Sequence, residues 1–212
     1  AASDVYKRQT ARCMSGGKPF APEIVAQAYR EVFNYFEDAI YRRFDLPVRH
    51  FLLDLAPFER FDLEMARMVS GDPRTGNLLD WLLHNTTMLR YDDVRHFHFW
   101  PQFRAFLLWE MEKECSEEKR RAVFSRGALY YELKEDYAHA LECYTKSGDH
   151  AKISELLIRN SEQHPGMGHY SEMETYYRAL PESEILASPS LMQGMSMLCA
   201  LAMDYELSLI HI

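Results

Sequence analysis

The segment from residue 48 to residue 111 has an order of elements that few folds share. Three short helical patterns come first, then two strand-like pieces, then a fourth helical pattern. Their expected ranges are 48–56, 63–70, 76–85, 88–91 and 95–99, with the last helix beginning at Pro101. A tight turn of Asp92, Asp93 and Val94 joins the two strand-like pieces. Helix, helix, helix, hairpin, helix is the order of a winged helix, which we predict for residues 47–115.

The third helix of this predicted domain is short of cations. It reads LLDWLL at 78–83, and little besides Arg74 is available to meet a phosphate. A helix that reads the major groove needs cations and donors to base edges. We therefore expect this helix to be buried or to form a protein interface. The residues expected to do so are Leu79, Trp81, Leu82 and Leu83.

Local signals set the ends of these elements. Asp62 and Thr75 are the expected N-caps of the second and third helices, since short polar side chains accept from the first free N–H groups. In the second strand, alternation places His96 and His98 on one face and the phenylalanines between and after them on the other. Two histidines on a strand can bind a metal, but a half-exposed hairpin face explains them more simply.

Composition narrows the class of protein. The chain has 212 residues, of which 47% are hydrophobic and 13% aromatic, so a sizeable core is expected. The formal net charge of −8 argues against unspecific binding of nucleic acid. We expect no membrane span and no signal peptide, and hence a cytoplasmic protein. Four widely spaced cysteines indicate free thiols and not a disulfide or zinc framework.

The two ends differ from the patterns beside them. Residues 1–9 and 207–212 resemble translated sequencing adapters, so 1–22 is expected to be an artefactual or disordered N-terminus and 207–212 an artefactual tail. The natural protein is then expected to continue past both ends. Between them, residues 23–46 show a helical pattern ahead of the predicted winged helix.

Residues 116–206 read as helical hairpins. The expected helices are 119–133, 137–146, 150–163, 169–180 and 189–205. Corresponding positions recur roughly every thirty residues or a little more, the period of tetratricopeptide-type repeats. A small Ala140 lets two helices approach closely, and tyrosines fill the groove around it. The tyrosines expected at these helix contacts are Tyr131, Tyr137 and Tyr144 in the first pair and Tyr176 and Tyr177 in the second. The predicted fold class is therefore mainly α, with a winged helix carrying a small β-hairpin, followed by a tetratricopeptide-like α-solenoid.

No catalytic or metal-binding constellation stands out. Gly17-Lys18 invites a phosphate-loop interpretation, but Arg12 and Pro19 occupy places where that motif needs Gly and Ser or Thr. The loop from His164 to His169 has two histidines without supporting thiols or carboxylates. We expect no catalytic residue, no metal ligand and no enzyme activity in this chain.

Several stretches together resemble a known family. They include YFE at 35–37, FLLDLAPFERF at 51–61, PQFRAFL at 101–107, ALPE at 179–182 and SPSL at 188–191. As a series over residues 23–206 they resemble the large transcription activators related to the maltose-regulon activator MalT. Those proteins are LuxR-type regulators of the signal-transducing ATPase class, in which a nucleotide-binding core, a winged helix, a helical-repeat sensor and a DNA-binding helix-turn-helix follow one another.

The resemblance singles out one position for cofactor sensing. The family usually places His just before the Pro of the 101–107 block, and Trp100 stands there in this chain. In related nucleotide switches a winged-helix His helps to sense the bound diphosphate. Trp100 is therefore the nucleotide-sensing position that the resemblance implies, although an indole cannot take up a proton as imidazole does.

The resemblance also implies the organisation and the role of the chain. Residues 23–46 would be a helix from the end of the nucleotide-binding module, 47–115 the winged helix and 116–206 the start of the sensor. The chain would be the regulatory middle segment of an ATP-dependent activator that couples nucleotide state to the sensor by domain packing. The parent protein would be a slow ATPase switch that binds ATP or ADP. This chain would bind neither, because the phosphate-binding motif is not among these residues.

The expected partners are the nucleotide-binding and DNA-binding domains of the same chain and a small-molecule or protein inducer at the repeats. No direct contact with nucleic acid or membrane is expected. Two alternatives stay open: a tetratricopeptide-like scaffold for protein–protein interaction, and a winged-helix DNA-binding protein.

Overall fold

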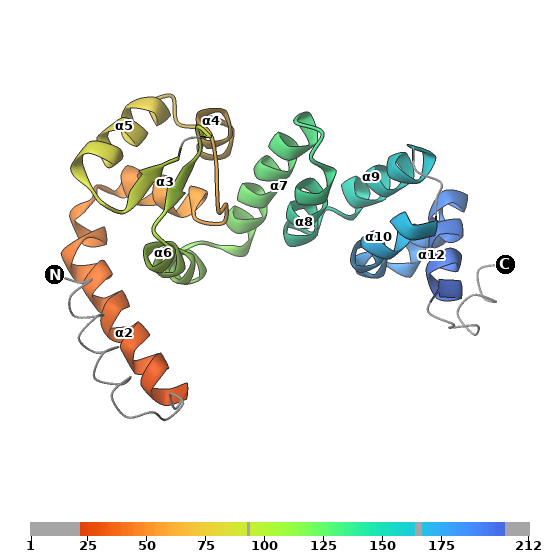
Figure 1. Cartoon of the computed structure of the whole chain (residues 1–212), viewed down its shortest axis with the longest axis horizontal. Coiled ribbons are helices and arrows are strands. Elements are labelled where there is room, and N and C mark those ends of the chain that lie inside the picture. The colour runs from red at the N-terminus through yellow and green to blue at the C-terminus, as the bar shows by residue number, and fades with distance from the viewer. Residues whose placement is uncertain (1–21, 93, 164–166, 202–212) are drawn as a thin grey trace. The chain divides into compact units, whose positions relative to one another are not determined.

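The computed structural model describes residues 22–92, 94–163 and 167–201, which belong to two compact units divided after Glu114 (Figure 1). The first unit contains α2 (Pro22–Ala39), the 3-10 helix η1 (Tyr41–Arg43), α3 (Leu46–Leu55), α4 (Leu63–Ser70), α5 (Thr75–Asn85), β1 (Leu89–Tyr91), β2 (Phe97–Phe99) and α6 (Pro101–Glu114). The order from α3 to α6 is the predicted order of a winged helix. Each strand is shorter than the sequence pattern suggested.

The second unit contains helices alone among its described residues. They are α7 (Glu117–Leu133), α8 (Tyr137–Ser147), α9 (His150–Gln163), α10 (Met167–Ala179), α11 (Glu182–Leu186) and α12 (Pro189–Leu201). α7 packs on α8 as a helical hairpin, and α10 packs on α8, α9 and α12. Packing of each helix on helices near it in sequence is compatible with the predicted α-solenoid, which stays a prediction. The short α11 was not expected, because five residues are too few for a helical period to be recognised.

The helices α4 and α5 show one correct and one wrong expectation about N-caps. Asp62 caps α4 as predicted, since its carboxylate accepts from the backbone N–H of Met65 over 2.7 Å. Thr75 does not cap α5 but is its first residue and is fully buried. The preceding turn is closed by Asp72, whose carboxylate accepts the backbone N–H of Arg74 over 2.7 Å. The Thr75 hydroxyl then donates to the carbonyl of Asp72 over 2.6 Å instead of facing the helix start.

The hairpin is an antiparallel pair, with Leu89 opposite Phe99, Arg90 opposite His98 and Tyr91 opposite Phe97. The predicted alternation is confirmed, because both β2 phenylalanines are buried whereas the two histidines are half-buried. In the wing turn, of which Asp93 lies outside the described residues, the Asp92 carboxylate accepts from the backbone N–H groups of Val94 and His96. These bonds hold the wing in shape.

Aromatic side chains join α2 to α6 in the core of the first unit. The ring centroid of Phe36 lies 5.4 Å from that of Phe103 and 5.7 Å from that of Phe106. Tyr41 meets Phe106 at 5.5 Å. Side chains of α2 thus pack within the compact unit that contains the winged helix. The assignment of 23–46 to a nucleotide-binding module stays a prediction.

Several expectations concern the two ends or the loop before α10. Residues 1–21, 164–166 and 202–212 lie outside the described part of the chain, and with them the predicted terminal artefacts and most of the loop with two histidines. Among the described helices, none combines the length and the apolar character that crossing a membrane requires.

Candidate functional site

Trp100 lies at the junction between β2 and α6, where backbone bonds hold it on both sides. Its N–H donates to the carbonyl of Met88 over 2.9 Å, and its carbonyl accepts from the N–H of Arg104 over 2.8 Å. The half-buried indole lies beneath the guanidinium of Arg90, 5.4 Å from the ring centroid. The structure therefore places this predicted cofactor-sensing residue on the wing, stacked by a cation. Such a ring can pack or donate one hydrogen bond, but it cannot titrate.

His98 and His96 have different neighbours in the wing. His98 pairs with Arg90 across the hairpin. The Nδ1 atom of His96 lies 4.0 Å from the Asp92 carboxylate, beyond hydrogen-bond distance. Within the described residues, no group of three His, Cys, Asp or Glu side chains is arranged to hold a metal ion.

The outer face of α5 differs from that of a DNA-reading helix. Its exposed side chains are Asn77, Asp80, Trp81, His84 and Asn85, and the helix contains no Lys or Arg. Arg74, the nearest cation before it, forms an ion pair with Asp72 over 2.8 Å. This face offers phosphates no cation, and the protein interface expected here stays a prediction.

The same helix corrects one expectation about burial. Leu79 and Leu82 are buried as expected, but Trp81 is 46% exposed. Its ring packs edge-on against Phe44, with centroids 6.0 Å apart. Helical spacing explains the error, because a residue that directly precedes a buried Leu82 points about 100° away from it.

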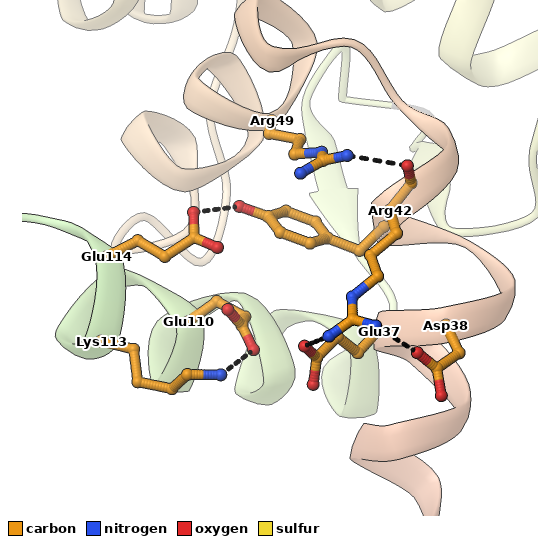
Figure 2. A network of polar contacts seen from close by, with 8 residues as sticks. Glu37, Asp38, Arg42, Arg49, Glu110, Lys113 and Glu114 are labelled. Carbon is orange, nitrogen blue, oxygen red and sulfur yellow. Dashed lines mark hydrogen bonds and ion pairs between the residues drawn. The ribbon is translucent and has the colours of Figure 1, made fainter.

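Tyr41 lies in a polar network that links η1 to the end of α6 (Figure 2). Its side chain is almost completely buried, and its hydroxyl donates to Oε2 of Glu114 over 3.0 Å. The guanidinium of Arg49 lies 5.4 Å from the centre of the Tyr41 ring. Arg49 also donates to the carbonyls of Arg42 and Phe44, over 2.7 and 2.8 Å. Burial, reinforced by the hydrogen bond to Glu114, raises the pKa of Tyr41 well above its usual range. The hydroxyl therefore stays protonated and keeps donating.

Figure 2 also shows two groups of ion pairs, one within α6 and one around Arg42. Glu110 on α6 is 1% exposed and accepts from Lys113 over 3.0 Å. Burial raises the pKa of Glu110, and the nearby Lys113 opposes that rise only in part. On the exposed side, Arg42 bridges Glu37 and Asp38 over 2.7 and 3.0 Å. These hydrogen bonds and ion pairs stabilise the packing of the helices, since the charged groups already bind one another.

The four residues predicted to pack in the first helical pair lie at the α7–α8 hairpin. Ala140 is fully buried, and the buried Tyr144 donates to Glu132 over 2.7 Å. Tyr131 and Tyr137 are only half-buried, and the Tyr131 ring stacks on His139 at 5.0 Å. Burial and the bond to Glu132 raise the pKa of Tyr144 above its usual range.

The two later tyrosines lie on α10 and serve different contacts. Tyr176 is half-buried and its hydroxyl reaches the carbonyl of Ala138 on α8 at 3.5 Å. Tyr177 is buried, with its pKa raised to about 12 by burial, and lies against Gly194 of α12. Gly194 was not singled out from the sequence, because an isolated glycine in a helical pattern does not show which side chain crosses it.

In a comparison with known families, residues 37–119 match the MalT winged helix domain. No curated protein matches the chain. The matched region runs from the end of α2 through the wing and α6, and it includes every residue of the network in Figure 2. This part of the chain is therefore similar to a winged helix domain of the MalT type.

Proposed function

We propose that this chain is the regulatory middle segment of a cytoplasmic, ATP-dependent, LuxR-family transcription activator of the MalT type. In this proposal the winged helix couples the nucleotide state of a neighbouring domain to a helical-repeat sensor through domain packing. The segment itself carries no catalysis. Nucleotide, promoter DNA and inducer bind elsewhere in the parent protein or at the repeats.

The main support is the match of residues 37–119 to the MalT winged helix domain. A second observation favours coupling over DNA readout. The exposed face of α5 carries Asp80 and the half-exposed Trp81 and has no Lys or Arg, so it suits a protein surface better than a phosphate backbone.

The coupling role is tested in a protein that contains the natural sequence upstream of this chain. Hydrogen exchange of that protein is compared with ATP, with ADP and without nucleotide. We expect exchange in α5 and in the wing to depend on the nucleotide, because these elements would change neighbours between states. Identical exchange in all three samples, despite measured nucleotide binding, would overturn the proposal.

A second experiment tests the alternative function, in which this chain itself binds DNA. Anisotropy of a labelled random duplex is measured at low and moderate salt. We expect no binding at either salt concentration. Binding that weakens with salt, and that is lost in Arg90→Ala or Arg95→Ala, would instead support a winged helix that contacts DNA through its wing.

A further inference from the structure

A hydrogen bond ties η1 to the end of α6 in the first unit. The first described elements of this unit are α2 and η1, and its last residue is Glu114, at the end of α6. Glu114 accepts the hydroxyl of Tyr41, a contact between residues 73 positions apart. Tyr41 cannot easily move, since its ring is buried against Phe106 and lies beneath Arg49.

The connection to the second unit is very short. Only Cys115 and Ser116 separate the end of α6 from the start of α7. Ser116 already caps α7, because its hydroxyl accepts from the N–H of Lys119 over 3.2 Å. A connection this short leaves few free dihedral angles, so the direction of the last α6 turn constrains the direction in which α7 begins.

We propose that the Tyr41–Glu114 contact fixes the last turn of α6 and thereby sets how freely the second unit moves relative to the first. Breaking the contact releases the α6 terminus and uncouples the units, whereas breaking a similar contact away from the α6–α7 junction does not. Through this contact, a movement of α2 and η1 would be passed to the end of α6 and from there to α7. This inference extends the proposed function, but it does not depend on nucleotide.

The chain supplies a matched control. Tyr144 in the second unit is also a buried tyrosine that donates to a glutamate, Glu132, and both residues lie within the α7–α8 hairpin. Tyr41→Phe and Tyr144→Phe each remove one hydroxyl and keep the ring. Glu114→Gln keeps an acceptor oxygen for Tyr41 while removing the charge.

The experiment measures distances between two spin labels by pulsed electron resonance, without nucleotide. The labels are attached at Asn77→Cys and Ala151→Cys, which are exposed positions in the first and second unit. Cys13 is replaced by Ser, and the buried Cys115, Cys143 and Cys199 are checked for labelling in a protein without the two new cysteines. Circular dichroism confirms that each variant is folded at the temperature of the measurement.

We expect Tyr41→Phe to broaden the distance distribution, while Tyr144→Phe and Glu114→Gln leave it close to that of the unsubstituted protein. An unchanged distribution in a folded Tyr41→Phe protein would overturn the proposal. Equal broadening by Tyr144→Phe would also overturn it, because the effect would then follow from general destabilisation. Neither result would bear on nucleotide sensing, which is tested by the exchange experiment with ATP and ADP.

Discussion

Gly194 on α12 lies against the phenol ring of Tyr177 on α10, so closely that a methyl group at position 194 would overlap the ring. The nearest atoms belong to a buried side chain, whose ring has little room to swing away. The contact explains why a glycine stands in the middle of a helix, where it would otherwise weaken the element.

We therefore predict that Gly194→Ala lowers the free energy of unfolding by about 1–3 kcal/mol, the usual cost of overpacking a core. The measurement is urea unfolding followed by circular dichroism. Gly76→Ala in α5 is the control, because its added Cβ would meet only the Arg67 side chain, at 3.9 Å. If Gly194→Ala is as stable as Gly76→Ala, the α10–α12 crossing is looser than described.

Arg104 on α6 holds the end of α3 with a forked contact. Its Nε donates to the carbonyl of Ala56 over 2.9 Å, and one terminal nitrogen donates to the carbonyl of Pro57 over 2.8 Å. Lys has one compact ammonium group and cannot reproduce that fork. We expect Arg104→Lys to cost about 1–2 kcal/mol of stability by thermal unfolding, since one carbonyl loses its donor. Arg43→Lys, at an exposed position of η1, should leave the melting temperature unchanged.

Trp81 and Leu82 are neighbours in sequence but differ in burial. From the sequence alone, Trp81→Ala would be predicted to cost roughly 3–5 kcal/mol, as for a core aromatic. With 46% of its side chain exposed and one edge-on contact to Phe44, we expect about 1 kcal/mol instead. Leu82→Ala should cost about 2–5 kcal/mol, because Leu82 is almost fully buried. Equal losses in a denaturation experiment would show that Trp81 is covered.

Glu110 should make the stability of the first unit depend on pH. Because burial raises its pKa, Glu110 binds a proton more tightly in the folded chain than in the unfolded chain. The free energy of unfolding therefore falls as the pH rises from the ordinary glutamate pKa through the raised one. Glu110→Gln should remove this part of the pH dependence, so its gain over the natural chain is largest at neutral pH and shrinks in acid.

Thermal unfolding at a series of pH values measures that effect. Glu112→Gln, on the exposed side of the same helix, is the control and should follow the natural chain at every pH. Parallel curves for the natural chain and Glu110→Gln would mean that Lys113 fully compensates the buried charge.

Local pattern was sufficient for much of the fold. The α4 range and the start of α6 at Pro101 follow from periodicity, an N-cap and a proline, all of which act within a few residues of the chain. The face of each β2 residue likewise follows from strand alternation. Thr75 was misassigned because the side chain of Asp72 competes for the same turn, which residue type alone does not reveal.

The candidate site depended on contacts that sequence patterns do not contain. Tyr41 and Glu114 are 73 residues apart, and nothing local marks either as a partner of the other. Glu110 falls on the apparently polar side of its helix, yet it is buried. Trp100 was recognised only through a family resemblance, and its stacking beneath Arg90 depends on the pairing of the two strands.

The close packing of α2 and α6 also determines how the first unit would carry mechanical force. Among the described residues of this unit, α2 is the first helix and α6 the last, and the rings of Phe36, Phe103 and Phe106 join the two helices directly. Tension applied along the chain would pass across these rings and bypass α3, α4, α5 and the hairpin. The wing would then keep its shape under a pull that is strong enough to strain α2 and α6.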